Sequence, residues 1–305
     1  MNSLRIFATG LGLILLLGTS SLRAFDGEAT TDVVFKATSD GSEQRYVIVL
    51  PAKFQSDQRH DVLIALHGHG SDRWQFIKDA RDECKAARDA AAKHRLIYVS
   101  PDYRARTSWM GPAAETDLVQ IIAELKQQHR VGRVLICGGS MGGTGALTFA
   151  ALHPELIDGV AAMNGTANLL EYAQFQEAIS ASFGGTKKAI PAEYKKRSAE
   201  YWPERLTMPV AMTTGGRDTL VPPQSCQRLA AVLKSLDREV LLLHRDATGH
   251  ETNLADATEI LEFVIKSSPA AGSQNGERSR TTSRGPPPSQ SPPVAPEPSR
   301  SSVAQ

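Results

Sequence analysis

The sequence predicts an α/β domain: a mostly parallel sheet of eight strands, with helices on both faces and a short helical cap. Short, near-continuous apolar runs recur along the chain, and most of them are separated by segments with apolar residues at helical spacing. Strands of this kind, alternating with helices, are typical of a parallel sheet that is covered on both faces. In such sheets ligands bind beyond the carboxyl ends of the strands, so functional side chains are expected there.

Residues 25–266 have the length of one such domain and can bury a substantial core. The first two expected strands form an antiparallel pair at one edge. The expected strands are 31–37, 44–51, 61–66, 96–100, 134–137, 159–163, 209–213 and 239–244. The expected helices are 74–93, 113–129, 146–151, 224–236 and 253–266.

Residues 1–24 resemble a secretory signal peptide. Arg5 precedes the apolar run Ile6–Leu17, and small residues follow it up to an expected cleavage site after Ala24. The alternative is an uncleaved membrane anchor, but the run is shorter than the roughly 20 residues that a membrane-spanning helix needs, which favours a cleaved signal. We therefore expect a secreted or periplasmic protein with no stable membrane insertion after the signal is removed.

Residues 267–305 are rich in proline, serine and arginine and nearly free of large apolar side chains. Such a segment cannot bury enough surface to offset the entropy of ordering it, so a disordered tail is predicted. Scattered arginines in a tract of this kind are typical of a solubilising segment rather than of a nucleic-acid site.

The charge balance and the cysteines exclude several classes of site. Lys and Arg number 34 against 33 Asp and Glu, a net charge of +1, which gives no reason to expect a nucleic-acid partner. Cys137 lies in an apolar strand, where a small buried side chain is expected. A disulfide between Cys84 and Cys226 is permitted by export but not implied. No Cys or His pairs have ligand spacing, so no metal site is predicted.

The stretch Gly138–Gly142 follows one apolar strand and precedes a helix. It reads Gly-Gly-Ser-Met-Gly and fits the G-x-S-x-G pattern, in which a sharply turned serine has its hydroxyl exposed above a sheet. A side chain at Gly138 or Gly142 should collide with its neighbours, because strand and helix pack closely around the turn. Ser140 is therefore a candidate nucleophile.

A second turn with the sequence His-Gly-His-Gly follows the strand 61–66. The backbone N–H of His69 and that of Met141 are predicted to form an oxyanion hole, which stabilises the negative oxygen formed during attack on a carbonyl. The side chain of His69 is interpreted as a histidine at the rim of the pocket rather than a catalytic group.

Two further strand ends supply an acid and a base. A serine hydroxyl is a poor nucleophile at neutral pH, so it needs a base such as His250, with a carboxylate such as Asp218 to fix the tautomer of the imidazole. Among the other candidates, Asp246 is interpreted as a solvated loop charge and His244 as a packing or surface residue. Asp102 and Asp117 are interpreted as a turn residue and a helix cap.

Taken together, Ser140, Asp218 and His250 in this order, with His67-Gly68 after the third strand, resemble the α/β-hydrolase superfamily. The resemblance covers essentially all of residues 25–266. It is greatest to the small esterase branch that includes esterase D and feruloyl esterases, and to the catalytic domains of prolyl oligopeptidase-type enzymes. It implies an α/β-hydrolase fold and a Ser-His-Asp mechanism with an acyl-enzyme intermediate and no cofactor. The His-Gly-His-Gly turn differs from the His-Gly-Gly-Gly of some lipases.

Two features bear on substrate choice. Trp109, in the loop after the fourth strand, lines the acyl or alcohol pocket or is a packing anchor. Residues 164–206 hold a large share of the chain's aromatic side chains and lie where this superfamily commonly inserts a cap. They cover the serine as a cap or are plain connecting helices that pack on the sheet.

The sequence thus leads to the hypothesis of a secreted serine hydrolase, a carboxylesterase for small or medium acyl esters. Export makes polysaccharide esters one substrate class. A prolyl oligopeptidase-type peptidase is the alternative among enzymes, which the absence of an N-terminal propeller argues against. A non-catalytic binding protein on the same scaffold is the alternative from another class. The sequence predicts no oligomeric state.

Overall fold

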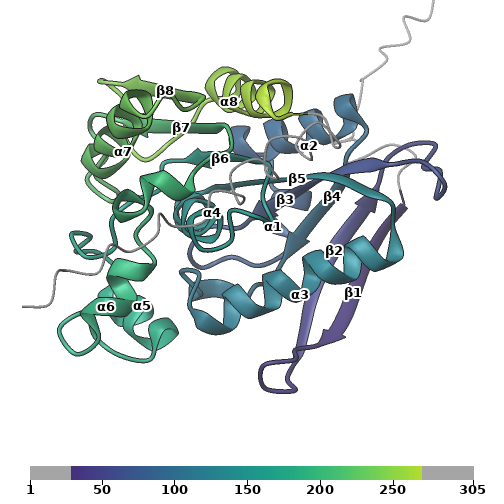
Figure 1. Cartoon of the computed structure of the whole chain (residues 1–305), viewed down its shortest axis with the longest axis horizontal. Coiled ribbons are helices and arrows are strands. Elements are labelled where there is room, and N and C mark those ends of the chain that lie inside the picture. Colours follow the sequence, from purple (N-terminus) through teal and green to yellow (C-terminus); the bar gives the residue numbers. More distant parts are fainter. Residues whose placement is uncertain (1–28, 270–305) are drawn as a thin grey trace, which may run out of the picture. The chain divides into compact units, whose positions relative to one another are not determined.

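The computed structural model of the chain describes residues 29–269. The expected signal peptide, and all but the first three residues of the expected tail, lie outside the described residues. Eight strands form one sheet in the order β1-β2-β4-β3-β5-β6-β7-β8 (Figure 1). β2 is antiparallel to both β1 and β4, and every other neighbouring pair is parallel. The predicted mostly parallel sheet with an antiparallel edge pair is confirmed.

The strands lie within one to three residues of the predicted runs at nearly every end, because a buried parallel strand needs a continuous apolar run. They are β1 Ala29–Lys36, β2 Glu43–Leu50, β3 His60–Leu66, β4 Ile97–Pro101, β5 Val131–Gly139, β6 Gly159–Met163, β7 Val210–Gly215 and β8 Val240–Arg245.

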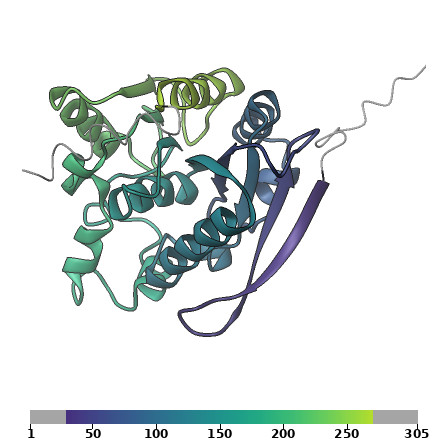
Figure 2. The ribbon, with the colours of Figure 1, turned by 45° about the vertical axis from the view of Figure 1, so that its right-hand side comes forward.

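The helices lie on both faces of the sheet, as Figures 1 and 2 show. α2 and α8 pack on one face, whereas α3, α4 and α7 pack on the other. Alternate residues of β3 contribute to the two cores, with Ile64 in one and Leu63 in the other. The α-helices are α1 Gln75–Lys78, α2 Asp82–His94, α3 Pro112–Gln128, α4 Met141–Leu152, α5 Gln176–Phe183, α6 Pro191–Lys196, α7 Gln224–Ser235 and α8 Leu254–Ser267. The short 3-10 helices are η1 Ala105–Thr107, η2 Ala199–Tyr201 and η3 Pro203–Arg205.

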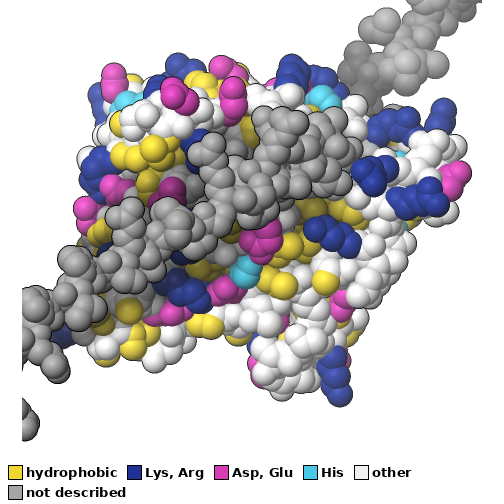
Figure 3. Space-filling model, viewed as in Figure 1, with side chains coloured by type: hydrophobic (Ala, Val, Ile, Leu, Met, Phe, Trp, Pro, Cys, Tyr) yellow, Lys and Arg dark blue, Asp and Glu magenta, His cyan; other side chains and the backbone are white. Residues whose placement is uncertain are grey.

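Charged side chains of both signs are interspersed on the face that Figure 3 shows, wherever it is not covered by grey atoms. This mixture agrees with the net charge of +1. Within residues 29–269, no helix combines the length and the apolar character that crossing a bilayer requires.

The single helix predicted for residues 74–93 is wrong, because the chain breaks it between α1 and α2. Asp79 has an extended backbone, with φ −69° and ψ 138°. Its Oδ1 accepts the backbone N–H of Arg81 at 2.9 Å, a local turn that competes with the helical hydrogen bonds. The break matters for function because Arg81 and the first residues of α2 reach the site described below.

The three cysteines are free and buried, so the disulfide between Cys84 and Cys226 that export permits is not formed. Cys84 packs in the core beneath α2 and α8, and Cys226 packs in the core beneath the opposite face of the sheet. Burial raises the pKa of the Cys84 thiol to about 12, so it stays protonated at neutral pH.

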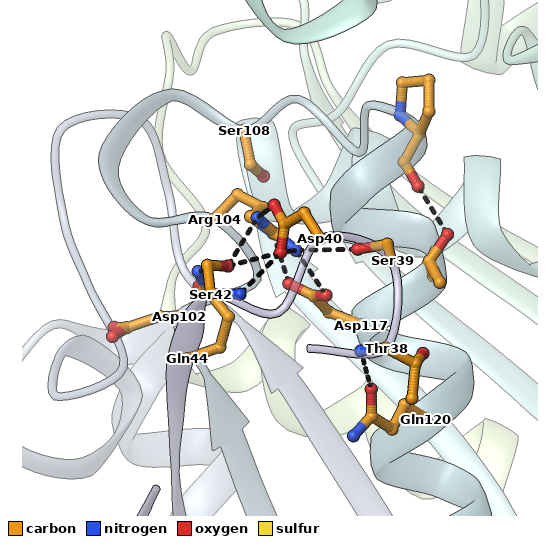
Figure 4. Close-up of polar contacts among 12 residues, drawn as sticks. Thr38, Ser39, Asp40, Ser42, Gln44, Asp102, Arg104, Ser108, Asp117 and Gln120 are labelled. Carbon is orange, nitrogen blue, oxygen red and sulfur yellow. Dashed lines mark hydrogen bonds and ion pairs between the residues drawn. The ribbon is translucent and has the colours of Figure 1, made fainter. Parts of the chain in front are cut away.

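Arg104 joins three segments beside the β1 edge of the sheet (Figure 4). Its guanidinium donates to the carboxylate of Asp117 in α3 at 2.5 and 2.8 Å, and to Asp40 in the β1–β2 loop at 2.6 Å. The interpretation of Asp117 as a helix cap is therefore wrong, since it lies inside α3 with its side chain 1% exposed. The neighbouring Tyr103 donates its hydroxyl to the His67 carbonyl at 2.6 Å, so this network helps to hold the turn after β3.

A second ionic network is built around Arg197, which is 1% exposed. Arg197 donates to Glu115 of α3 at 2.6 Å and to the Met110 carbonyl at 2.7 Å, and thereby anchors the segment after α6. His153 contacts the other carboxylate oxygen of Glu115 at 2.9 Å. Burial opposes ionisation of Glu115, but the hydrogen bonds from His153 and Arg197 outweigh it and lower its pKa to about 2.

Removing the charge of Glu115 should change the acid stability of the protein. Because its pKa is depressed from 4.5 to about 2, ionised Glu115 stabilises the folded state fully above pH 4.5. That contribution, roughly 2 kcal/mol after allowance for its exposed part, is lost as the pH falls toward 2. In Glu115→Gln, the free energy of unfolding should therefore fall less steeply over this range, as measured by urea denaturation at successive pH values. Glu155→Gln, an exposed carboxylate near His153, is the matched control, and equal slopes in the two variants would contradict the prediction.

Candidate active site

Ser140 occupies a strained turn between β5 and α4. Its backbone has φ 57° and ψ −117°, which side-chain-bearing residues seldom adopt and which costs about 1–3 kcal/mol. The turn is held by β6, because the N–H of Ser140 donates to the Met163 carbonyl at 2.8 Å. α4 begins at once with Met141, several residues earlier than expected, so the serine is fixed between two rigid elements.

The glycines around Ser140 have the steric role that the sequence predicts. A β-carbon on Gly138 would lie 2.5 Å from the carbonyl carbon of Gly142, well inside van der Waals contact. A β-carbon on Gly142 would overlap the backbone carbonyl of Leu66 at the end of β3. The elbow and the turn after β3 are therefore in direct backbone contact.

Asp218 and His250 meet Ser140 from the loops that follow β7 and β8. The Nε2 atom of His250 lies 2.9 Å from the Ser140 hydroxyl, and its Nδ1 lies 2.7 Å from Oδ2 of Asp218. The other carboxylate oxygen accepts the backbone N–H groups of Leu220 and Val221 at 3.0 and 2.8 Å. The Asp218 side chain is 1% exposed and that of His250 is 25% exposed.

These contacts determine where the imidazole proton lies. An ionised carboxylate is only an acceptor, so Nδ1 of His250 must carry the proton that faces Asp218. Nε2 is then an acceptor, and the hydroxyl of Ser140 donates to it. The arrangement can move a proton from the serine to the imidazole as the serine attacks a carbonyl.

The rival acid and base lie elsewhere. Asp246 is 98% exposed and lies 3.2 Å from His244 rather than near His250. The other nitrogen of His244 contacts the Thr214 hydroxyl at 2.9 Å. Asp102 accepts the N–H and the guanidinium of Arg73 at 2.9 and 3.0 Å. Its backbone carbonyl accepts the N–H of Ala105 at 2.5 Å, in keeping with its interpretation as a turn residue.

The turn after β3 lies beside the elbow and has a free donor. A β-carbon on Gly68 would be 3.5 Å from the Gly139 carbonyl oxygen. The next residue, His69, has a backbone N–H that donates to no acceptor among residues 29–269. Met141 is the first residue of α4, so its N–H has no partner within the helix. Both predicted oxyanion donors thus remain available.

Gln75 is a site residue that sequence reasoning missed. It lies in the first turn of α1 and is 8% exposed, and its Oε1 accepts the N–H of Gly68 at 2.7 Å. The buried His67 contacts two carbonyl oxygens, those of Gly68 at 2.9 Å and Asp102 at 3.1 Å, and burial lowers its pKa. These contacts of Gln75 and His67 hold the turn after β3 from both sides. Gln75 could not be found from the sequence, because a lone glutamine belongs to no motif.

Trp109 is fully buried, which matches the packing-anchor alternative. Its indole N–H donates to Nδ1 of His69 at 3.1 Å, and its ring lies 5.4–5.5 Å from the rings of Phe175 and Tyr172. Phe175 also lies 4.3 Å from the imidazole of His69. Trp109 therefore packs against His69 and does not line the cavity described next.

A cavity of about 420 Å³ opens beside Ser140. Between residues 164 and 206, only Asn164 lines it, and Phe175 packs against the imidazole of His69. The cavity is lined by Gly68, Gln75, Phe76, Arg81, Asp82, Glu83, Gly139, Ser140, Met163, Asn164, His250, Glu251 and Thr252. In the described part of the chain, no three His, Cys, Asp or Glu side chains are grouped so as to hold a metal ion.

A family model described as the prolyl oligopeptidase family matches residues 103–267, more than half of the chain. The match includes Ser140, Asp218 and His250. A comparison with curated protein sequences gave no match.

Among solved structures, dipeptidyl peptidase 4 of Porphyromonas gingivalis has a TM-score of 0.62 at 16% identity, over 79% of this chain and 36% of that one. A puromycin-hydrolyzing peptidase of Mycobacterium tuberculosis has a TM-score of 0.64 at 17% identity, over 80% and 40%. A thermostable esterase has a TM-score of 0.61 at 17% identity, over 81% and 64%. At these identities the likeness shows the fold alone, and the chain spans less than two thirds of the length of each.

Proposed function

Because the chain belongs to the prolyl oligopeptidase family of serine hydrolases and has the α/β-hydrolase fold, we propose that it is a carboxylesterase for esters of small or medium acyl groups. The observation that carries the proposal is the chain of contacts from Ser140 through His250 to Asp218, at 2.9 and 2.7 Å. A cavity of about 420 Å³ beside the serine suits an ester of this size.

In the proposed mechanism, Ser140 attacks the ester carbonyl while His250 accepts its proton. The N–H groups of His69 and Met141 donate to the oxygen that becomes negative. His250 then passes the proton to the departing alcohol, which leaves an acyl group on Ser140. Water enters, loses a proton to His250 and frees the acid by the same route.

A peptidase is the second candidate, because the family is named after a peptidase and two of the three structural neighbours described above are peptidases. One of the neighbours described above is a thermostable esterase, and this likeness supports ester hydrolysis as the first candidate. Polysaccharide esters remain within the proposal if residues 1–24 direct export.

A substrate panel should separate the two candidates. It holds p-nitrophenyl acetate and butyrate, acetylated sugars, feruloyl esters and prolyl peptides, and a fluorophosphonate probe reports the fraction of active serine. We expect at least one ester to be cleaved with kcat/KM above about 10⁴ M⁻¹s⁻¹ and no measurable cleavage of the peptides. Peptide cleavage as fast as ester cleavage would establish the peptidase, and an intact protein that never labels would indicate a binding role.

A further inference from the structure

Asn164 is a cavity residue that the proposed mechanism does not use. It is the first residue after β6, next to Met163, whose carbonyl holds the N–H of Ser140. It lines the same cavity as Ser140 and His250, and it is only 6% exposed. A buried polar side chain in this position must satisfy its hydrogen-bonding groups or remain costly.

The NH₂ group of the Asn164 side chain has a hydrogen-bond partner, whereas its carbonyl oxygen has none among the described residues. Its Nδ2 donates to the Thr252 hydroxyl at 3.0 Å, and that hydroxyl in turn contacts Thr213 at 2.7 Å. Its Oδ1 is buried and has no donor among the described residues. An unpaired buried acceptor destabilises the protein, and a ligand with an N–H or O–H group would supply the missing hydrogen bond.

The charged side chains around the cavity indicate whether a ligand with an N–H or O–H group should be cationic, neutral or anionic. Three carboxylates line it, those of Asp82, Glu83 and Glu251, against one cation, Arg81. Arg81 already pairs with Asp79 at 2.7 Å and with Glu83 at 3.6 Å, so it adds little attraction for an anion, and the lining keeps an excess of two negative charges. Glu83 is the most buried of the three carboxylates that line the cavity, with 17% of its side chain exposed, and it lies against Gly139 beside the nucleophile. A net negative wall favours a cationic donor over a neutral one.

We propose that Asn164 and the adjoining carboxylates form a subsite for an ammonium group of the substrate, with Oδ1 of Asn164 accepting one of its N–H bonds. The inference rests on the proposed ester hydrolysis and narrows its substrates to esters that carry a primary amine. Asn164 is then a specificity-determining residue, because it contacts substrate away from the reacting carbonyl.

Matched esters test the subsite. The acyl series is the methyl esters of three- and six-carbon acids that end in ammonium, hydroxyl or methyl, and the alcohol series is the acetates of the corresponding alcohols, all followed by pH-stat at pH 7. In at least one series, kcat/KM should be about tenfold higher for the ammonium ester than for its methyl-ended analogue, with the hydroxyl ester between them. No preference for ammonium in either series overturns the proposal.

Variants attribute the preference to named groups. Asn164→Gly should remove most of it, and glycine is chosen because residue 164 has φ 47°, which glycine adopts without strain. Asn164→Asp should increase it, since the acceptor is kept and a negative charge is added. Glu83→Gln should lower it, whereas Glu177→Gln, an exposed carboxylate of α5 outside the cavity, should leave the ratio unchanged. Equal ratios in all four variants would overturn the assignment.

A binding measurement keeps this inference separate from the esterase proposal. Hexylammonium should protect Ser140 from a fluorophosphonate probe at concentrations about tenfold lower than hexanol, whether or not any ester is cleaved. Protection without ester cleavage would overturn the esterase and keep the subsite. Ester cleavage with equal protection by the two compounds would overturn the subsite alone.

Discussion

Replacing Ser140 by alanine should lower kcat for ester hydrolysis by about 10⁶-fold, because no other group in the contact chain can form the acyl intermediate. The fold should be unaffected. Alanine keeps the β-carbon that already tolerates φ 57°, and the N–H that donates to Met163 remains. Turnover of p-nitrophenyl butyrate and labelling by a fluorophosphonate probe measure the loss.

Ser235→Ala is a suitable control, since it removes a hydroxyl in the last turn of α7, outside the residues that line the cavity. Circular dichroism melting should give the same Tm for both variants and the parent. A Ser140→Ala protein that is folded and still turns over ester at a rate within tenfold of the parent would remove Ser140 from the mechanism.

The sequence predicted the structure best where a single local requirement, such as an apolar strand or a position that only glycine fits, decides the conformation. A buried parallel strand needs an apolar run, so the strands of the sheet could be predicted, and only glycine fits where Gly138 and Gly142 meet neighbouring backbone. Because parallel strands end at one edge, groups after β5, β7 and β8 could be expected to meet, and the structure brings Ser140, Asp218 and His250 together.

Residues whose role depends on tertiary partners could not be predicted in the same way. The break at Asp79 is different, because its cause is local: a side-chain turn to Arg81 ends the helix, although the apolar spacing continues through it. An arginine is usually expected on the surface, yet Arg197 is buried. Its partners are Glu115 of α3 and the carbonyl of Met110 in the loop before α3. Gln75 and Asn164 reach the cavity through the fold alone, because an isolated amide follows no sequence pattern.

Replacing Asp218 by asparagine should lower kcat by about 10⁴-fold, because the hydrogen bonds around residue 218 would impose the wrong tautomer on His250. The fold should not be disturbed. Two backbone N–H groups, those of Leu220 and Val221, donate to Oδ1 of Asp218. The asparagine oxygen must take that place, which turns its NH₂ group toward Nδ1 of His250.

Nδ1 of His250 would then become the acceptor in Asp218→Asn, and the proton would move to Nε2, which faces the Ser140 hydroxyl. The imidazole could no longer take the proton of Ser140. The loss should therefore appear in kcat, with little change in KM, when p-nitrophenyl butyrate turnover is followed at neutral pH. Asp246→Asn, whose carboxylate is 98% exposed and faces His244, should change kcat less than about twofold. Equal losses in the two variants would mean that Asp218 does not orient the base.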